Sequence, residues 1–322
     1  AYELCDQISV LRLGKVVGDI PPERLSGMSE RETINEVIAM MFAKDEGHDS
    51  DTEVPIGDTT SGAERFSLDG TKTAIMSVEG ISTNGELGEC PLKSVSFDIR
   101  SGEIFGIAGI DGNGQKHLAE ALAGQRPVTA GLISHGGNDV TGLKVPGRRK
   151  LGINYLTDER LGEGTASTHS VATNLVLKSI GDEPHWIHGF TLWGSIHEHA
   201  VRQIETHDIR TPSERTIIGQ LSGGNIQKTL LAREITDDVT VAIFNKPTYG
   251  LDLQNIKLAR ERIREGAASG VATLIISTEL DELMEMCHRI GVMYQGRLAG
   301  IVDNTPGVEK EIGMLMTGAS AA

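Results

Sequence analysis

Residues 105–124 read FGIAGIDGNGQKHLAEALAG. The pattern predicts a short apolar strand over 105–110, then a glycine-rich turn, then a helix over 118–124 that ends at Gly124. Glycines let backbone N–H groups approach an anion, and the first turn of a helix favours negative charge. The context is therefore that of a phosphate-binding loop.

The turn departs from the usual phosphate-loop pattern, in which Lys and then Ser or Thr follow the last glycine. Gln115 takes the Lys place, Lys116 takes the Ser/Thr place, and His117 follows. Taken alone, the segment suits either a phosphate site or a strand–helix turn that holds no ligand.

Strand and helix patterns alternate outward from this stretch. Two short apolar runs rich in β-branched residues, 239–244 and 271–277, are typical of buried parallel strands. The segment 256–270 between them has the pattern of a helix. This alternation predicts an α/β domain with a doubly wound sheet.

The composition limits the partners and the compartment. The chain has 322 residues, 39% of them hydrophobic, which is enough for one large domain or two smaller ones with a sizeable core. A net charge of −15 argues against broad binding to nucleic-acid phosphates or anionic lipid. Cys5, Cys90 and Cys287 are too sparse for a disulfide framework or a zinc site, which favours a reducing cytosol. No apolar run approaches the ~18 residues of a membrane span, and we expect no signal peptide.

Two distant segments resemble each other. Residues 1–20 read AYELCDQISVLRLGKVVGDI and residues 283–302 read LMEMCHRIGVMYQGRLAGIV. Both patterns predict a helix end, a strand, a Gly-Lys/Arg turn and a second strand, and a helical tail follows each. We interpret this as an internal duplication rather than chance. The matching pairs are Glu3/Glu285, Cys5/Cys287, Ile8/Ile290, Val10/Val292, Gly14/Gly296 and Gly18/Gly300.

The duplication predicts a domain organisation. Residues 1–43 would be the C-terminal remnant of a first domain whose main part is missing upstream or supplied in trans. Residues 44–70 carry eight acids and two bases among Gly, Ser and Thr, so we expect an acidic flexible linker over 44–71. The second domain would then run over 72–322.

A second glycine-containing segment narrows the interpretation. Residues 221–228 read LSGGNIQK and open a helix, which makes a second helix start that favours an anion. This octet resembles the signature motif of ABC transporter ATPases. The order GIAGIDGNGQ, YLTDER, LSGGNIQK, PTYGLD, ISTELDEL and RIGVMYQGRL is similar to that family over about residues 72–318. More narrowly, it resembles the second ATP-binding domain of the tandem ATPases that drive simple-sugar and nucleoside importers.

The resemblance implies a P-loop NTPase of the ABC ATPase type. Its mostly parallel sheet would carry an antiparallel β subdomain and a helical signature subdomain over about 165–235. Gly250, Leu251 and Asp252 match the D-loop of the family. The residues that the resemblance places around nucleotide are Gly109, Asp111, Gly112, Asn113, Gly114, Gln115, Lys116, His117, Asp158, Ser222, Gly223, Gly224, Asn225, Gln227 and Asp252.

The sequence departs from the ABC ATPase motifs at the positions that bind metal and catalyse hydrolysis in that family. Asp158 stands where the family's Q-loop Gln reaches the metal. Asn245 and Lys246 stand at the Walker B Asp and catalytic Glu, and Thr278 stands at the switch His. No aromatic residue lies between Phe66 and Phe97, so the ring that stacks on adenine is absent from its usual place.

These departures predict a domain that binds ATP without hydrolysing it. Hydrolysis needs a metal on the phosphates and a group that orients water. Asn245 is a weak Mg²⁺ ligand, and Lys246 beside phosphates stays charged and cannot act as a base. We expect no metal site and no catalytic residue here. Lys116 and Lys246 would place positive charge where Mg²⁺ and the P-loop Lys normally lie, which predicts nucleotide binding with weak Mg²⁺ dependence.

The intact signature implies a role in trans. In the family, two ATPase domains sandwich two nucleotides, and each site pairs the P-loop of one domain with the signature of the other. The resemblance thus implies a first ABC ATPase domain, membrane permease subunits and, indirectly, a solute-binding protein as partners, at the cytoplasmic face of the cell membrane. A regulatory pseudo-ATPase without transport, a degenerate inactive fragment, and an ATPase that survives through Lys116 remain open.

Three other features call for structural explanations first. His185, His188, His197 and His199 gather near two tryptophans, but their spacing lacks a helical pairing for metal, so we expect a surface loop. The family resemblance adds contact with the permease as another interpretation of this region. The basic run 148–150 is predicted to be a solvated loop face, and 279–286 to be a packing helix with its acids outside.

Overall fold

A computed structural model describes residues 5–12, 15–29, 32–33, 36–37, 40 and 73–318. The chain divides into two compact units, residues 1–64 and 65–322, which we describe separately. The expected linker over 44–71 lies outside the described residues. Within the described part of the chain, no helix has the length and apolar character needed to cross a membrane.

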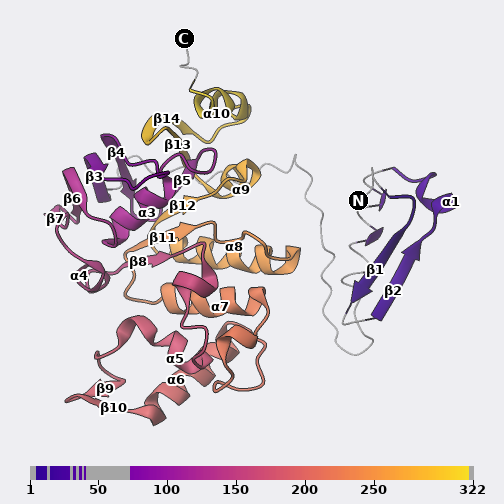
Figure 1. The fold of residues 1–322 in the computed structure, drawn as a ribbon, viewed down its shortest axis with the longest axis horizontal. Coiled ribbons are helices and arrows are strands. Elements are labelled where there is room, and N and C mark those ends of the chain that lie inside the picture. The colour runs from indigo at the N-terminus through magenta and orange to yellow at the C-terminus, as the bar shows by residue number, and fades with distance from the viewer. Residues whose placement is uncertain are drawn as a thin grey trace. The chain divides into compact units, whose positions relative to one another are not determined.

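The second unit is built on a six-stranded sheet (Figure 1). Every neighbouring pair is parallel except the pair formed by the edge strand β14, which confirms the α/β class with a mostly parallel sheet. The strands, in spatial order, are β14 (Arg297–Asp303), β13 (Arg289–Tyr294), β5 (Ile104–Ala108), β12 (Ala272–Ile276), β11 (Val241–Asn245) and β8 (Ile153–Leu156).

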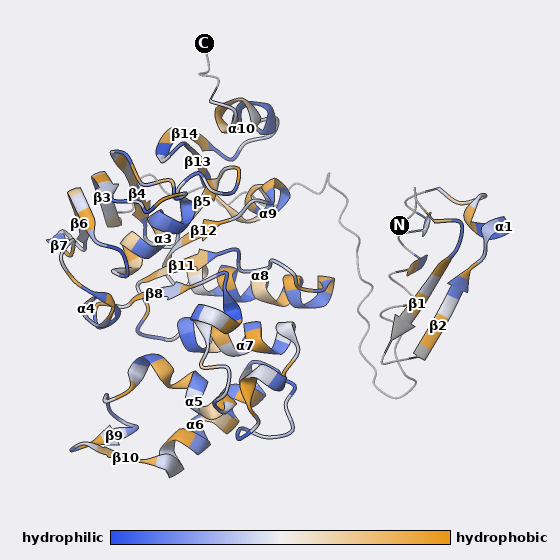
Figure 2. Ribbon diagram, viewed as in Figure 1, coloured by the Kyte–Doolittle hydropathy of each residue, from blue (hydrophilic) through white to orange (hydrophobic). Residues whose placement is uncertain are grey.

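The central strands are buried on both faces, as their unbroken apolar runs predict. Figure 2 shows these strands in hydrophobic colours. Successive residues point to opposite faces: Ile243 packs on one side of the sheet with Leu118 of α3 (Gln115–Ala123), and Phe244 packs on the other with Ile263 of α8 (Leu253–Ala268). Both faces are therefore covered, as a doubly wound sheet requires.

An antiparallel sheet shares the core on the α3 side. Its strands, in the order β4-β3-β6-β7, are β4 (Val95–Arg100), β3 (Ala74–Thr83), β6 (Val128–His135) and β7 (Asn138–Asp139). Met76, Ile81 and Ile133 of this sheet are fully buried with Leu122 of α3. The antiparallel β subdomain that the resemblance implies is thus present.

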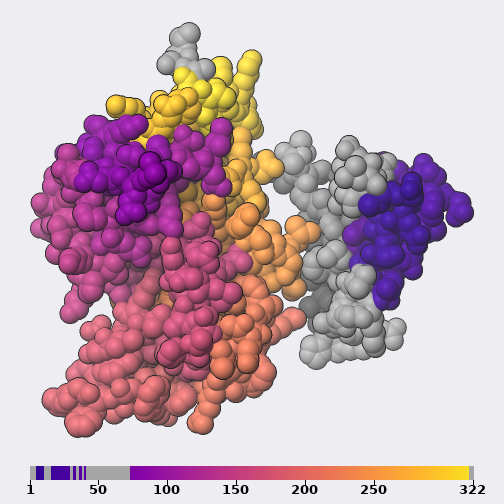
Figure 3. Space-filling model, in the orientation of Figure 1, coloured from indigo at the N-terminus to yellow at the C-terminus, as the bar shows by residue number. Residues whose placement is uncertain are grey.

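A helical subdomain follows β8 in the chain. In the space-filling view (Figure 3) it forms the lower, pink-to-orange lobe of the second unit. Ile196 of α6 and Ile226 of α7 are buried in one core with Val171 and Leu175 of α5. Its elements are η1 (Arg160–Gly164), α5 (Val171–Leu175), η2 (Leu177–Ser179), β9 (Trp186–Ile187), β10 (Phe190–Thr191), α6 (Trp193–Thr206), η3 (Ile218–Gln220) and α7 (Gly223–Glu234).

The C-terminal end of α7 lies on a buried group of charges. Glu234 is 1% exposed, and its Oε1 lies 2.6 Å from Lys178 Nζ and 2.8 Å from Arg233 Nε. Lys178 Nζ also donates to the carbonyl of Tyr155 on β8 at 2.6 Å. This group therefore joins α7, η2 and the sheet.

The structure corrects two predictions about charged residues. Arg148, in α4 (Val145–Arg149), is 1% exposed rather than solvated, because its guanidinium donates to the carbonyls of Leu122, Thr141 and Leu143. This burial lowers its pKa to about 10.

The second correction concerns Glu282 in α9 (Leu280–Met286), which is 2% exposed although its acids were expected to lie outside. Its Oε1 accepts a hydrogen bond from Thr248 Oγ1 at 2.5 Å. The apolar side of the helix, with Leu283 and Met286, packs as predicted.

The first unit contains a hairpin, β1 (Ile8–Arg12) with β2 (Lys15–Ile20), followed by α1 (Pro22–Leu25). Its pairing repeats that of β13 with β14: Ile8 faces Ile20 as Ile290 faces Val302, and all five pairs correspond at one constant offset. Both hairpins shift register at the same point, after Val10 and after Val292.

In each hairpin, a residue from the segment that follows it packs on the second strand's glycine. A Cβ on Gly18 would meet Met40 Sδ at 2.5 Å, and a Cβ on Gly300 would meet Leu315 Cδ1 of α10 (Glu309–Met316) at 2.9 Å. The strands predicted in both segments are observed, and they pair in the same register. Glu3, Gly14 and most of the first helical tail lie outside the described residues.

Candidate functional site

The glycine-rich turn after β5 is shaped by glycines that no other residue can replace. Gly109 and Gly114 have φ of 154° and 101°. A Cβ on Gly109 would lie 2.7 Å from the carbonyl of Met293, and one on Gly114 would lie 3.2 Å from the carbonyl of Cys90. A Cβ on Gly112 would meet nothing within 4 Å, so this glycine borders open space. The turn thus combines a crowded base with an open mouth at the start of α3.

The turn between β13 and β14 holds this loop from behind. Gln295 N donates to Asn113 Oδ1 at 2.7 Å, and Gly296 N donates to Asn113 O at 3.0 Å. Gly296 has φ of 81°, and a Cβ there would collide with Pro91 O. Asn113 therefore points its side chain to the protein and not to the open mouth.

Gln115 folds back into the loop instead of reaching outward. Its side chain is buried, its Oε1 accepts from Asn113 N at 3.0 Å, and its Nε2 donates to Ile110 O at 3.0 Å. One of the backbone donors that would face a phosphate is thus satisfied by Gln115.

Lys116 lies beside the segment that follows β8. Its Nζ is 2.7 Å from Glu163 Oε1 on η1 and 3.8 Å from Glu120 Oε1, one helical turn further along α3. The hydrogen bond with Glu163 raises the pKa of Lys116 and lowers that of Glu163. Lys116 therefore remains charged and joins α3 to η1.

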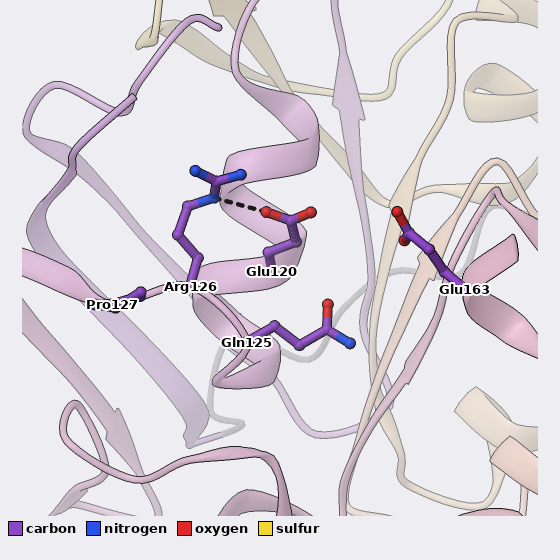
Figure 4. Close-up of a pocket in the computed structure, with 5 residues that line it drawn as sticks. All are labelled: Glu120, Gln125, Arg126, Pro127 and Glu163. Carbon is purple, nitrogen blue, oxygen red and sulfur yellow. Dashed lines mark hydrogen bonds and ion pairs between the residues drawn. The ribbon is translucent and has the colours of Figure 1, made fainter. Parts of the chain in front are cut away.

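A cavity of about 360 Å³ opens beside this pair. Figure 4 shows Glu120 and Arg126 joined on the α3 side and Glu163 facing them across the cavity. Arg126 also forms a two-point ion pair with Glu89, at 3.1 and 3.2 Å. The charges of the lining residues are thus largely matched within the chain.

His117 is buried between α3 and β3. Its Nδ1 lies 3.0 Å from Thr83 Oγ1, and its Nε2 lies 3.1 Å from Glu89 Oε2. Burial, with the nearby charge of Arg126, lowers its pKa, which favours the neutral ring. The structure therefore places His117 against the antiparallel sheet, on a side of the helix that does not face the open mouth.

Asp158 and Asn245 meet at the carboxyl ends of two neighbouring strands, β8 and β11. Asn245 is 2% exposed, and its Nδ2 donates to Asp158 Oδ1 at 2.9 Å. Tyr155 lies beneath them with its hydroxyl buried, and burial raises its pKa to about 12. The Asn245 amide thus donates its hydrogen bond to the Asp158 carboxylate within the chain.

Lys246 follows Asn245 and returns to the glycine-rich turn. Its Nζ lies 2.7 Å from Asp111 Oδ1 and 2.9 Å from Asp111 Oδ2. Its φ of 48° is unusual for a residue with a side chain. This backbone conformation turns the chain out of β11 toward the mouth of the glycine-rich turn. Thr278, at the end of β12, is exposed and lines a small depression with Lys246 and Tyr249.

The second glycine segment forms the exposed start of α7. Ser222 is the N-cap residue, but its side chain caps no backbone N–H and instead accepts from Asn225 Nδ2 at 2.9 Å. Gln227 is buried and donates to Pro247 O at 2.5 Å. Asp252, exposed at the start of α8, accepts from Asn255 N at 2.9 Å and from Asn255 Nδ2 at 2.7 Å. The first turn of α7 thus keeps free donors at the surface.

Residues 92–249 match the ABC transporter family model, which spans the glycine-rich turn, Asp158, the start of α7 and Asn245. This segment is an ABC transporter ATP-binding domain. The names that the sequence resemblance gave are kept for its parts: P-loop for the glycine-rich turn, signature for the start of α7, and D-loop region for the segment 247–252.

The relatives of this ABC domain are import ATPases by name. The chain is 30% identical to the guanosine import ATP-binding protein NupO of Bacillus subtilis, over 98% of this chain and 58% of NupO. It is 33% identical to the ribose import ATP-binding protein RbsA 3 of Rubrobacter xylanophilus, over 98% of this chain and 58% of that protein. The chain therefore spans little more than half the length of these relatives.

A solved ABC structure shows the same fold. The dimeric ATP-binding cassette MJ0796, in a post-hydrolysis state bound to ADP and Pi, superposes with a TM-score of 0.61 at 16% identity, over 71% of this chain and 99% of that one. At this identity the likeness concerns the fold, and it bears out the ABC ATPase type.

The residues at the metal position of this ABC domain do not fit Mg²⁺. Mg²⁺ takes oxygen ligands, mainly carboxylates, hydroxyls, phosphates and water. Lys116 stands at the hydroxyl position and pairs with Glu163, and Asn245 presents its amide N–H₂ to Asp158. Lys246 adds a positive charge at the mouth. ATP fits better, because the glycine loop and the start of α3 still offer backbone donors and a lysine.

The histidine-rich region is partly buried in the helical subdomain. His185 Nδ1 lies 3.0 Å from Ser195 Oγ, and the rings of His185 and His199 are 5.0 Å apart. Burial lowers the pKa of both rings. Among the described residues, no group of three or more His, Cys, Asp or Glu is arranged for a metal ion. Phe190 and Trp193 nearby are exposed at the surface.

Sequence reasoning missed the two carboxylates near Lys116. Glu120 had a signal, since it lies four residues after Lys116 on one helix. Glu163 had none, because its contact depends on how η1 folds against α3. Arg160 lies in the quoted YLTDER stretch but was not singled out, and the structure brings it to Gly223 and Tyr249.

Proposed function

We propose that the chain is the second half of the ATP-binding subunit of an ABC importer for nucleosides or simple sugars. In this proposal its own P-loop site binds ATP without turnover, and its signature completes the ATP site of a first ABC ATPase domain. The names of NupO and RbsA 3 support the importer class. The repeated hairpin register supports a first domain related to the second.

One observation carries the division of roles. Each side chain that replaces a metal or base position is paired inside the chain: Lys116 with Glu163, Asn245 with Asp158, and Lys246 with Asp111. Ser222, Gly223 and Asp252 stay exposed. The P-loop side thus lacks the groups for hydrolysis, whereas the signature side keeps its free donors for a phosphate held by another domain.

The remaining parts of the proposal follow from the importer class. The partners are the first ATPase domain, permease subunits and, indirectly, a solute-binding protein, and the subunit lies peripherally at the cytoplasmic face of the membrane. The domain boundaries proposed are 1–43 for the remnant, 44–71 for the linker and 72–322 for the second ATPase domain.

The test is ATP binding by calorimetry, with Mg²⁺ and with EDTA, and phosphate release from the same samples. We expect binding under both conditions and no turnover. A matched variant, Gln115→Lys with Lys116→Thr, Asn245→Asp and Lys246→Glu, restores the usual ABC residues and should make binding depend on Mg²⁺. Turnover by the unmodified chain would overturn the proposal, and absence of ATP binding would favour a degenerate fragment.

The signature is tested separately. When the chain is mixed with an ABC ATPase domain that has an intact P-loop and Walker B carboxylates, turnover by that domain should rise. Ser222→Arg should remove the stimulation, because its side chain blocks the face that receives the phosphate. Stimulation that survives this change would contradict a role for the signature.

A further inference from the structure

Arg160 joins three segments that lie far apart in the sequence. It begins η1, two residues after Asp158. Its Nη2 donates to the carbonyl of Tyr249, within the D-loop region 247–252. A Cβ on Gly223, in the first turn of α7, would lie 3.4 Å from Arg160 Nη1. The guanidinium therefore lies between the signature and the D-loop and touches both.

The charge of Arg160 has no counterpart at this position. The side chain is half-buried, and burial lowers its pKa, although an arginine remains protonated. Within the described part of the chain, no carboxylate forms an ion pair with Arg160. It also lies at the N-terminal end of α7, where the helix dipole is positive and a cation is unfavourable. A neutral side chain would destabilise the start of α7 less than a cation does, so helix stability does not explain the guanidinium.

Two further contacts hold the same segments together. Asn255, fixed by Asp252 at 2.7 Å, packs against Gly224 so closely that a Cβ there would collide with it. Gln227 of α7 donates to Pro247 O at 2.5 Å. Of the residues that join these segments, Arg160 alone comes from the segment after Asp158, so it also links η1 to the signature and the D-loop.

We propose that Arg160 is a positioning residue that fixes the D-loop against the signature, so that both present one surface to the partner's nucleotide. The inference deepens the proposed function, because the surface it orders is the one assigned there to the trans site. The planar guanidinium suits this role, since it can bond Tyr249 O with one nitrogen while another lies on the flat surface left by Gly223.

The test is hydrogen–deuterium exchange of the nucleotide-free full chain, read in peptides that cover 222–227 and 247–252. Arg160→Met should speed exchange about tenfold or more in both segments, because a charged hydrogen bond is lost. Arg160→Lys keeps the charge and should restore protection in part. Arg215→Met is the matched control, since Arg215 is 75% exposed on the helical subdomain.

The outcomes separate the inference from its alternatives. Faster exchange in both segments, at an unchanged melting temperature and with partial rescue by lysine, supports positioning. Unchanged exchange in either segment would overturn it, and so would equal loss with Lys and Met. If Arg160→Met fails to fold, Arg160→Gln, which is uncharged and too short to reach Tyr249 O as the guanidinium does, gives the same readout. The readout needs no ATP, so it stands apart from the calorimetric test of the proposed function.

Discussion

Near the P-loop, Lys116, Asn245 and Lys246 each bond a carboxylate from another segment of the chain. Lys246 and Asp111 illustrate this best, because they join the end of β11 to the mouth of the loop and Asp111 is 68% exposed. Because the carboxylate of this pair is exposed and can be solvated, Lys246 can exchange it for a ligand at small cost. Lys246 is thus positioned to move from a carboxylate to a phosphate.

Lys246→Met should weaken ATP binding in EDTA by about tenfold, the loss expected for one charge-assisted hydrogen bond. Asp111→Asn should have the opposite effect, because it releases the lysine from its carboxylate. Calorimetry measures both affinities. Lys257→Met is the control, since its side chain is 65% exposed on α8. Equal affinities for the two variants would contradict a phosphate-binding role for Lys246.

At the scale of elements, α7 joins the signature at its start to a buried charge cluster at its end. Glu234→Gln should destabilise the second unit by about 3–5 kcal/mol, because the buried Arg233 and the half-buried Lys178 would keep their charges without a carboxylate. Urea unfolding measures the loss. Glu261→Gln, in an exposed pair with Lys257 on α8, should change stability by less than about 0.5 kcal/mol. Similar losses in the two variants would show that the buried cluster adds nothing.

His207, at the C-terminal end of α6, should make the stability of the second unit depend on pH. Burial, together with the charge of Arg262, lowers the pKa of His207 to about 4. The unfolded chain, with an ordinary histidine pKa near 6.5, binds more protons between these values, so stability should fall as pH drops from about 6.5 to 4. Thermal melts across this range should lose part of their slope in His207→Gln. An unchanged slope would place the titration elsewhere.

For the whole molecule, ATP that binds without being hydrolysed should stabilise the native state against unfolding. A ligand at 100 times its dissociation constant adds about 2.7 kcal/mol to the native state. For a unit of this size, that corresponds to a rise of about 5–10 °C in melting temperature. Scanning fluorimetry should show equal rises with Mg²⁺ and with EDTA. A rise confined to Mg²⁺ would mean that a metal site survives.

Much of the fold could be predicted because its signals are local. The apolar runs at 239–244 and 271–277 are buried strands β11 and β12, since a strand that is covered on both faces has no room for polar residues. The glycine turn after β5 was also readable, because positive φ angles at Gly109 and Gly114 demand glycine. The matching hairpins could also be recognised from the sequence, because the register of two paired strands follows from the turn between them and from the alternation of apolar residues.

The tertiary structure decided which side chains meet. Arg148 belongs to a basic run that resembles a solvated loop, yet three carbonyls from two other segments, α3 and the loop 141–143, enclose it. Likewise, Gln227 of the signature motif turns inward to Pro247, and Lys116 turns to Glu163. The sequence by itself determined the order of strands, turns and helices, because these depend on near neighbours. The partner of each buried or paired charge depends on which distant segments the fold brings within hydrogen-bonding reach, and no spacing along the chain encodes that.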